Sequence, residues 1–437
     1  MSRRTLHRAV LTFLLILCAA VGAYGQAAGS YTPYSIYGVG DLSHPGTAWN
    51  KTMGGVGIAT RNNNYINITN PASVTARDSL SFMTDFSLFS DNKIFNQGGI
   101  VSASNTFNIN DIAVSFPIFS NHLAMMGGIQ PFSDTGFGYS FNYTDPELIG
   151  RTGNITYSAT GNGSIYKLFA AVGVRIGRNL SLGAQWNFYF GNISKYYYTT
   201  FNDASYNSIH NSTEGSLSGH GFKVGLQYEQ PINAKLTIGV GVTYASAASL
   251  GGSVELGRYS SGSAAADTLY HRVDKLGVDS KVAIPSEIGV GVVFKNPGKW
   301  SLEVDYTRAD WSASGIDNAR GFTASNAFKA SVAEAWRVGF EIVPNRNDIR
   351  YYFNHVAYRA GAYYKNDYFL LDGQKVSSMG VTLGLTFPIV NLISGLTVGV
   401  DLGQRGSLAG NQIRERYINF SIGFNLYDLW FRKYQYQ

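Results

Sequence analysis

The chain has 437 residues, a formal net charge of +6 and only 14% charged residues, compared with roughly 25% in ordinary soluble domains. Gly, Tyr and Phe are abundant, with 50, 29 and 26 copies. The small, scattered positive charge argues against a nucleic-acid partner. Beyond the first 25 residues no run of 18 apolar residues occurs, which excludes a helical membrane span.

Residues 1–25 have the layout of a secretory signal peptide. The basic stretch "MSRRTLHR" precedes the apolar run "AVLTFLLILCAAVGA", and small residues lead to a cleavage site near Gly25–Gln26. A single transmembrane helix is the alternative, but the apolar run is short. The only cysteine, Cys18, lies in this leader behind Leu17, where a lipoprotein signal would need a small residue. The exported chain therefore has no thiol for a disulfide, a metal site or catalysis.

Residues 26–78 lack the period of a strand or helix and are predicted to form a hatch, or plug. Within them, "GGVGIATRNNNYINITNPASV" spans residues 54–74. Its glycines allow tight turns, and Pro71 fixes a bend that pushes Asn70 into an extended conformation. A wide barrel leaves an aqueous channel unless something fills it, so we expect this segment inside a barrel. A disordered periplasmic tail is the alternative.

Residues 79–437 alternate between apolar and polar side chains, as in "LSLGAQWNFYF" at 180–190 and "YINFSIGFNL" at 417–426. The polar side is mostly Gly, Ser, Thr and Asn, which favours a barrel lumen over the Lys- and Glu-rich outer face of a soluble sandwich. Aromatic residues cluster at strand ends, as in membrane girdles. We predict an all-β fold, a transmembrane antiparallel barrel of about 14 strands. The strands are expected to begin near residues 79, 107, 122, 161, 179, 217, 234, 281, 299, 327, 354, 376, 395 and 413.

Four polar stretches are predicted to be extracellular loops: residues 145–160, 199–215, 251–280 and 312–326. The predicted third strand contains Gly127, Gly128 and Pro131, and proline is normally kept from central strands. A kink there would open a gap in the barrel wall toward a shielded lumen. A harmless bulge near the periplasmic rim is the alternative.

The sequence offers no catalytic or metal-binding constellation, and no cofactor is expected. The histidines after the leader are dispersed without ligand spacing: His44, His122, His210, His220, His271 and His355. Glu303 and Asp305 share one strand face, but we expect them to pair with Arg or Lys of a neighbouring strand rather than to act as a catalytic pair. No nucleophile elbow or zinc-protease motif occurs. The sequence does not indicate an enzyme.

The chain resembles the FadL/TodX family of outer-membrane transporters of hydrophobic compounds. The likeness rests on the hatch stretch with its Asn70-Pro71-Ala72 triplet, on "IPSEIGVGVVFKNPGKWSLEVDYTRADW" at 284–311, and on "WRVGFEIVP" with "YRAGAYY" within 336–364. It covers most of the chain in order, although only the triplet is a compact motif. The end departs from the family, since "YDLWFRKYQYQ" continues past Phe424. The resemblance implies a third strand kinked inward and lateral exit of the substrate.

The expected function is a passive outer-membrane channel of a Gram-negative bacterium for hydrophobic or amphipathic small molecules, whether fatty-acid-like or aromatic. Hatch movement around Asn70, Pro71 and Ala72 would gate it, and Gly127, Gly128 and Pro131 would form the lateral opening. The lipid bilayer and a hydrophobic ligand are the expected partners. The alternative is a FadL-like docking or secretion-accessory protein that binds another protein through its loops or its tail. A plain hydrophilic porin is disfavoured by the hatch.

Overall fold

The computed structural model describes residues 29–119, 122–203, 205–261, 266–323, 325–390, 393–410 and 412–429. The predicted signal peptide, its cleavage site and most of the C-terminal tail lie outside these ranges. Among the helices in these ranges, none is long and apolar enough to cross a membrane.

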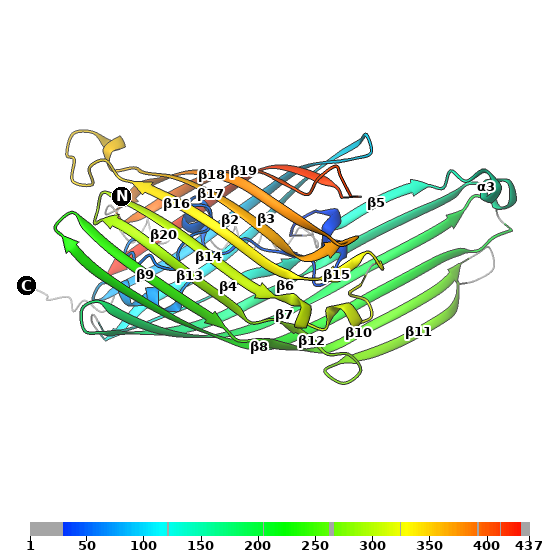
Figure 1. Cartoon of the computed structure of the whole chain (residues 1–437), viewed down its shortest axis with the longest axis horizontal. Helices are drawn as coiled ribbons and strands as arrows, with labels where there is room; N and C mark the ends of the chain where they lie inside the picture. The colour runs from blue at the N-terminus through cyan, green and yellow to red at the C-terminus, as the bar shows by residue number, and fades with distance from the viewer. Residues whose placement is uncertain are drawn as a thin grey trace, which may run out of the picture.

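The main body is a closed antiparallel β-barrel of 14 strands (Figure 1), as predicted. β2 pairs with β20, from Ser81 opposite Leu429 onward, and this pairing closes the barrel. Several barrel strands are broken into shorter elements: β4 with β5, β9 with β10, β11 to β13, and β15 with β16. The elements are β2 (Ser81–Gln97), β3 (Ile100–Phe119), β4 (Leu123–Asp134), β5 (Phe137–Asn142), β6 (Ile155–Ile176), β7 (Leu180–Phe201), β8 (Ser208–Asn233), β9 (Leu236–Ala245), β10 (Ala248–Ser261), β11 (Ala266–Leu276), β12 (Val282–Ile284), β13 (Glu287–Asn296), β14 (Trp300–Asp310), β15 (Phe328–Ala330), β16 (Val332–Ile342), β17 (Ala357–Leu371), β18 (Gln374–Val390), β19 (Ser394–Arg405) and β20 (Arg414–Leu429).

Three of the predicted loops contain strand, and two of them, 199–215 and 251–280, are largely strand, which corrects the sequence-based boundaries. β8 begins at Ser208 rather than near 217, β6 at Ile155 rather than near 161, and β10 and β11 occupy much of 251–280. Only the helix α3 (Pro146–Thr152) and short turns remain of the first two loops. Outside the bilayer both faces of a strand can meet water, so pairing continues without the apolar alternation that marks a membrane strand. The pair Tyr196–Ser212 is an example.

Residues 29–78, here called the plug, lie inside the barrel, where Figure 1 shows them in blue. The plug contains η1 (Pro33–Ile36), β1 (Asp41–Leu42), α2 (Ala48–Lys51) and η2 (Pro71–Ala76). It is bonded to opposite sides of the wall: the Gly54 N–H donates to Thr382 Oγ1 at 2.8 Å, and Asn70 Nδ2 donates to the Leu226 carbonyl at 3.2 Å. The segment is therefore held by the barrel around it and is no free tail.

An apolar core fills the lumen toward the end with the longer connections, which is the extracellular end in bacterial barrels. The predicted loop 312–326 folds over this end, through η3 (Trp311–Ala313) and η4 (Ile316–Asn318). Trp311 packs on Tyr368 with ring centroids 4.6 Å apart, and Tyr37 of the plug stacks on Phe328 at 5.5 Å. These buried rings join the plug to the wall in one hydrophobic cluster.

The turn between β16 and β17, residues 343–356, is longer than the other turns at the periplasmic end and contains η5 (Tyr352–Asn354). Asp348 organises it by accepting backbone N–H groups of Arg350 at 2.7 Å and Tyr351 at 3.0 Å, and the Asn354 side chain. The Asn354 amide and these N–H groups hold the pKa of Asp348 below its usual value. The turn is thus a structured protrusion.

This turn leans over the outer surface of the barrel. Tyr358 lies on the outward face of β17, and its hydroxyl donates to the Phe353 carbonyl at 3.2 Å. Tyr352 donates to the Pro388 carbonyl of β18 at 2.9 Å. Ile349 at the tip is fully exposed and Phe353 is 69% exposed. Apolar and aromatic side chains on the outside of a barrel rim belong to the lipid interface.

We therefore expect a spin label at Ile349→Cys to lie in lipid. In vesicles, the label should be more accessible to oxygen than to a water-soluble nickel chelate, because oxygen concentrates in the acyl region. Ile100→Cys is the matched control, since this isoleucine is 77% exposed beside the turn that joins β2 to β3 at the other end; its label should favour the chelate. Equal chelate access at both sites would contradict the placement. The one native cysteine, Cys18, lies in the predicted leader.

Candidate functional site

The Asn70-Pro71-Ala72 triplet is the point at which the plug is wedged against the wall. Asn70 is fully buried and caps η2: its Oδ1 accepts the Ala72 N–H at 3.0 Å. Its Nδ2 donates to the Ile58 carbonyl at 2.7 Å as well as to β8. Pro71 begins η2, where its missing N–H leaves no bond unmade. The triplet is thus a helix cap that joins two parts of the plug to the barrel.

A row of three paired glycines makes room for this triplet. Gly173 of β6 is opposite Gly183 of β7, which is opposite Gly225 of β8. A Cβ atom at Gly183 would lie 2.3 Å from the Pro71 carbonyl carbon, and one at Gly225 would lie 2.0 Å from Asn70 Oδ1. The glycines on the polar side of these strands therefore provide clearance for the plug.

Gly183→Ala is expected to lower the free energy of unfolding by about 1–3 kcal/mol, because the added methyl overpacks the backbone of η2. Urea titration of the refolded barrel, followed by its mobility on unheated gels, measures this. Gly150→Ala is the matched control, since a Cβ there meets no atom within 4 Å; it should be neutral or slightly stabilising. A loss for Gly183→Ala no larger than that control would contradict the wedge.

Glu303 and Asp305 of β14 bind plug backbone, which corrects the prediction that they pair with Arg or Lys. Glu303 accepts the N–H groups of Ala59 at 2.6 Å and Thr60 at 3.0 Å, and also the Thr60 hydroxyl. Asp305 accepts those of Gly57 at 2.8 Å and Ile58 at 3.0 Å. Both carboxylates are buried. The plug turn at residues 57–60 supplies four backbone N–H groups that the plug itself leaves unpaired. These groups bond the two carboxylates in place of a cation.

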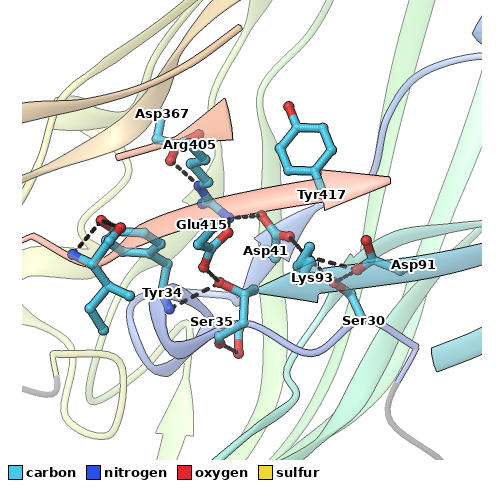
Figure 2. Close-up of polar contacts among 12 residues, drawn as sticks. Ser30, Tyr34, Ser35, Asp41, Asp91, Lys93, Asp367, Arg405, Glu415 and Tyr417 are labelled. Atoms are coloured by element: carbon cyan, nitrogen blue, oxygen red, sulfur yellow. Dashed lines mark hydrogen bonds and ion pairs between the residues drawn. The ribbon is translucent and has the colours of Figure 1, made fainter. Parts of the chain in front are cut away.

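A second anchor is an ion-pair network between the plug and β2, β17, β19 and β20, shown in Figure 2. Arg405, 4% exposed, bonds Asp41 of the plug at 2.9 Å and Asp367 at 2.7 Å, and Glu415 lies 3.7 Å away. Lys93 pairs with Asp91 at 2.7 Å and lies 3.7 Å from Asp41. The plug residue Asp41 is thus shared by two wall cations.

The predicted kink residues occupy two different surroundings in β4. Gly127 and Gly128 pair with both neighbours, β3 and β6. The β3 pairing ends at Ile129 opposite Ile112, and beyond it Pro131 pairs only with β6, where the register shifts. Pro131 thus lies where β4 no longer pairs with β3, whereas Gly127 and Gly128 lie earlier in β4, where both neighbours are paired.

The plug occupies the edge of β4 that β3 leaves free. Asp41 and Leu42 of β1 pair with Asp134 and Ser133, and the Ser43 N–H donates to the Phe132 carbonyl at 3.0 Å. This region between β3 and β4 is called the wall gap below. It is filled by plug backbone and not by a neighbouring barrel strand.

Two cavities meet at this strip of plug. A central cavity of about 240 Å³ is bordered by Pro131, Phe132, Tyr189 and Trp311. A side pocket of about 60 Å³ lies against residues 108–110 of β3. Residues 41–44 and Pro131 border both. These four plug residues therefore lie between the two cavities.

Of the predicted site residues, only Pro131 borders these cavities; Asn70, Pro71 and Ala72 lie at the wall of β6 to β8, and Gly127 and Gly128 line neither. Sequence reasoning missed Arg405, Lys93 and the pairing of β1. One signal was available for Arg405. It follows Asp401 by four residues in an alternating strand, which places both on the polar, lumen side.

The family model of BamG matches residues 6–437. No curated protein matches. Among solved structures, the toluene transporter TodX of Pseudomonas putida aligns with a TM-score of 0.58 at 14% identity, over 90% of this chain and 100% of that one. A FadL homologue of Pseudomonas aeruginosa gives 0.56 at 13%, over 88% and 99%. The toluene transporter TbuX of Ralstonia pickettii gives 0.55 at 13%, over 87% and 98%. These three similarities concern the fold.

Proposed function

The chain belongs to the BamG family, and from its plugged barrel we propose that it is an outer-membrane channel for passive uptake of hydrophobic or amphipathic small molecules. The transporters TodX and TbuX share its fold, which supports the class of function. A cleaved signal peptide at residues 1–25 exports it to the outer membrane of a Gram-negative bacterium. The role requires no catalytic residue.

The observation that carries this proposal is the position of residues 41–44. They separate the central cavity from the wall gap and border both cavities. Asp41 and Leu42 of this strip pair with β4 as β1, a strand of two residues, and Ser43 adds one hydrogen bond to Phe132. A ligand in the cavity leaves sideways when this strip moves, passing between β3 and β4 at Pro131.

Gating is assigned to Asn70, Pro71 and Ala72. They are wedged against three adjacent strands, and the Asn70 side chain bonds both the plug turn at Ile58 and the wall at Leu226. Any rotation of the plug must break these bonds. A small shift at the triplet is thereby coupled to the turn that Glu303 and Asp305 hold.

The test is binding of a long-chain fatty acid to the purified, refolded barrel, with uptake into vesicles measured beside it. Wild type should bind saturably. Asn70→Ala and Pro131→Ala should retain binding and change the rate of uptake, because they alter the gate and the exit. Absence of saturable binding for fatty acids and for aromatic hydrocarbons alike would contradict the proposal.

A second candidate function, docking of another protein, is favoured by the packing at the extracellular end. There the apolar core around Trp311, Ile316 and Phe322 is buried under the described part of the loop, in the place where ligand would enter. A barrel that serves as a scaffold needs no open lumen. If ligands fail to bind, capture of a specific outer-membrane partner in stoichiometric amounts, lost when the external strands β10 and β11 are shortened, would support this function.

A further inference from the structure

Among the described residues, three cations that border the central cavity lack an ion pair and act on one another; a fourth, Lys365, also borders it without an ion pair but interacts with Asp367 and Asp41. Lys167 of β6, Lys223 of β8 and Arg337 of β16 are half-buried and border the cavity. Within the described ranges none of them forms an ion pair. Arg337 has one polar contact in these ranges, to Thr307 Oγ1 at 3.0 Å.

Other buried cations of the same lumen are satisfied. Arg405 and Lys93 share four carboxylates. Lys195 donates to the carbonyls of Ile36 at 2.7 Å and Gly38 at 3.3 Å. Arg359 pairs with Glu341 at 2.7 Å. Burial in this lumen therefore usually comes with acceptors; among the described residues Lys51, which lies over the Phe89 ring at 4.1 Å, is another cation without an ion pair.

The three cations form one electrostatic group with Glu287, and Asp305 also acts on Lys223 and Arg337. Lys223 interacts with Lys167, with Arg337 and with Glu287, and Glu287 acts on all three. The other carboxylates that border the cavity have partners of their own: two plug N–H groups for Asp305, Arg308 for Glu334, and Arg405 for Asp41 and Asp367. Three positive charges thus face Glu287 and Asp305, a carboxylate already bonded to the plug, and the group keeps an excess of positive charge. Like charges repel strongly in a half-buried site, so an anion would relieve the repulsion.

We propose that the cavity binds a phosphate monoester through Lys167, Lys223 and Arg337, so that the ligand of this channel is a phosphorylated amphiphile. A phosphate monoester carries a charge of about −1.5 to −2 and offers three acceptor oxygens for the three cations, whereas a carboxylate carries one charge and offers two oxygens. Arginine offers a fork of N–H donors suited to phosphate. Tyr189, Phe132 and Ile58 border the same cavity and supply apolar contact for a chain. The identity of this ligand as a transported molecule rests on the proposed uptake function. Binding at the site is measured without uptake.

The test is isothermal titration of the purified barrel, in a neutral detergent, with n-dodecyl phosphate, dodecanoate, dodecanol and inorganic phosphate. Dodecyl phosphate should bind most tightly. Lys223→Gln and Lys167→Gln should each weaken it about tenfold or more, the loss expected for one charge-assisted contact. Glu287→Gln should strengthen it, because the competing carboxylate is gone; a general folding defect would not do so. Lys235→Gln, in an exposed turn, should leave it unchanged.

Inorganic phosphate separates the two sources of this chemistry. If inorganic phosphate displaces dodecyl phosphate at a similar concentration, the site is supported with free phosphate as its ligand. If it does not, the site is supported with a phosphorylated lipid head group as its ligand. Equal binding of dodecanol and dodecyl phosphate, or no effect of Lys223→Gln and Glu287→Gln in folded protein, would overturn the inference. Binding of dodecyl phosphate without any uptake into vesicles would instead contradict the transport function and leave the site intact.

Discussion

Replacing Glu303 with Ala is expected to release the plug turn at residues 57–60 from the wall and open the lumen to ions. The change removes the acceptor of three hydrogen bonds, from the Ala59 and Thr60 N–H groups and the Thr60 hydroxyl. Hydrogen bonds to a charged group contribute about 1.5–3 kcal/mol each, and the N–H groups left behind are buried. We expect a loss of about 3 kcal/mol or more in plug attachment. In planar bilayers the variant should show conductance steps that wild type lacks.

The matched control for this prediction is Glu255→Ala. Glu255 lies on β10 with an exposed side chain and a single partner, His271. It should leave the conductance unchanged. If Glu303→Ala were as silent as the control, the carboxylate would not hold the plug. Adding Asp305→Ala, which removes the acceptor for Gly57 and Ile58, should increase the leak further.

Arg405→Met is expected to be the most destabilising single change in the barrel. It deletes the cation that bonds Asp41 and Asp367 and lies near Glu415, so Asp367 and Glu415 lose the cation beside them in a buried site and Asp41 keeps only Lys93 at 3.7 Å. Breaking a buried ion pair in this way costs about 3–5 kcal/mol. The methionine keeps most of the side-chain length, so the loss reports charge. The measurement is the urea midpoint for unfolding of the refolded barrel.

Arg308→Met serves as the control, because Arg308 is 56% exposed and lies 3.8 Å from Glu334. Exposed pairs contribute about 0–1 kcal/mol, so its midpoint should barely move. If the urea midpoint of Arg405→Met moved no further than that of Arg308→Met, the result would contradict the anchoring role. Adding Asp367→Asn and Asp41→Asn to Arg405→Met should recover part of the loss, since it removes two of the carboxylates that Arg405 balanced.

The barrel could be predicted from the sequence because its period is local. In a strand such as 180–190, the alternation of apolar and polar residues shows by itself which side chains lie on each face. The outer ends of β6, β8 and β10 were missed because they are rich in Gly, Ser, Thr and Asn, the composition expected of loops, although inward side chains such as Ala159 and Val254 are buried. Their pairing comes from neighbours distant in sequence, as between Ser212 and Tyr196.

The plug could be predicted as a segment but not as a set of contacts. Asn70 and Pro71 were identified, yet their seat is a glycine row on three separate strands. Glu303 was predicted with the wrong partner, because its carboxylate oxygens accept hydrogen bonds from N–H groups nearly 250 residues earlier in the chain. Backbone donors leave no mark in the sequence. A glycine that recurs at the same lumen level of adjacent strands is the signal that sequence reading could use.

Lateral exit at the wall gap is tested most directly by a disulfide between β1 and β4. Leu42 and Ser133 are antiparallel partners, and partners in a sheet lie within the Cα distance that a disulfide requires. Leu42→Cys/Ser133→Cys should take up ligand when reduced, lose uptake when oxidised and regain it on addition of a reductant. Uptake at the full rate in barrels whose disulfide is confirmed by mass spectrometry would show that ligand does not leave through the gap.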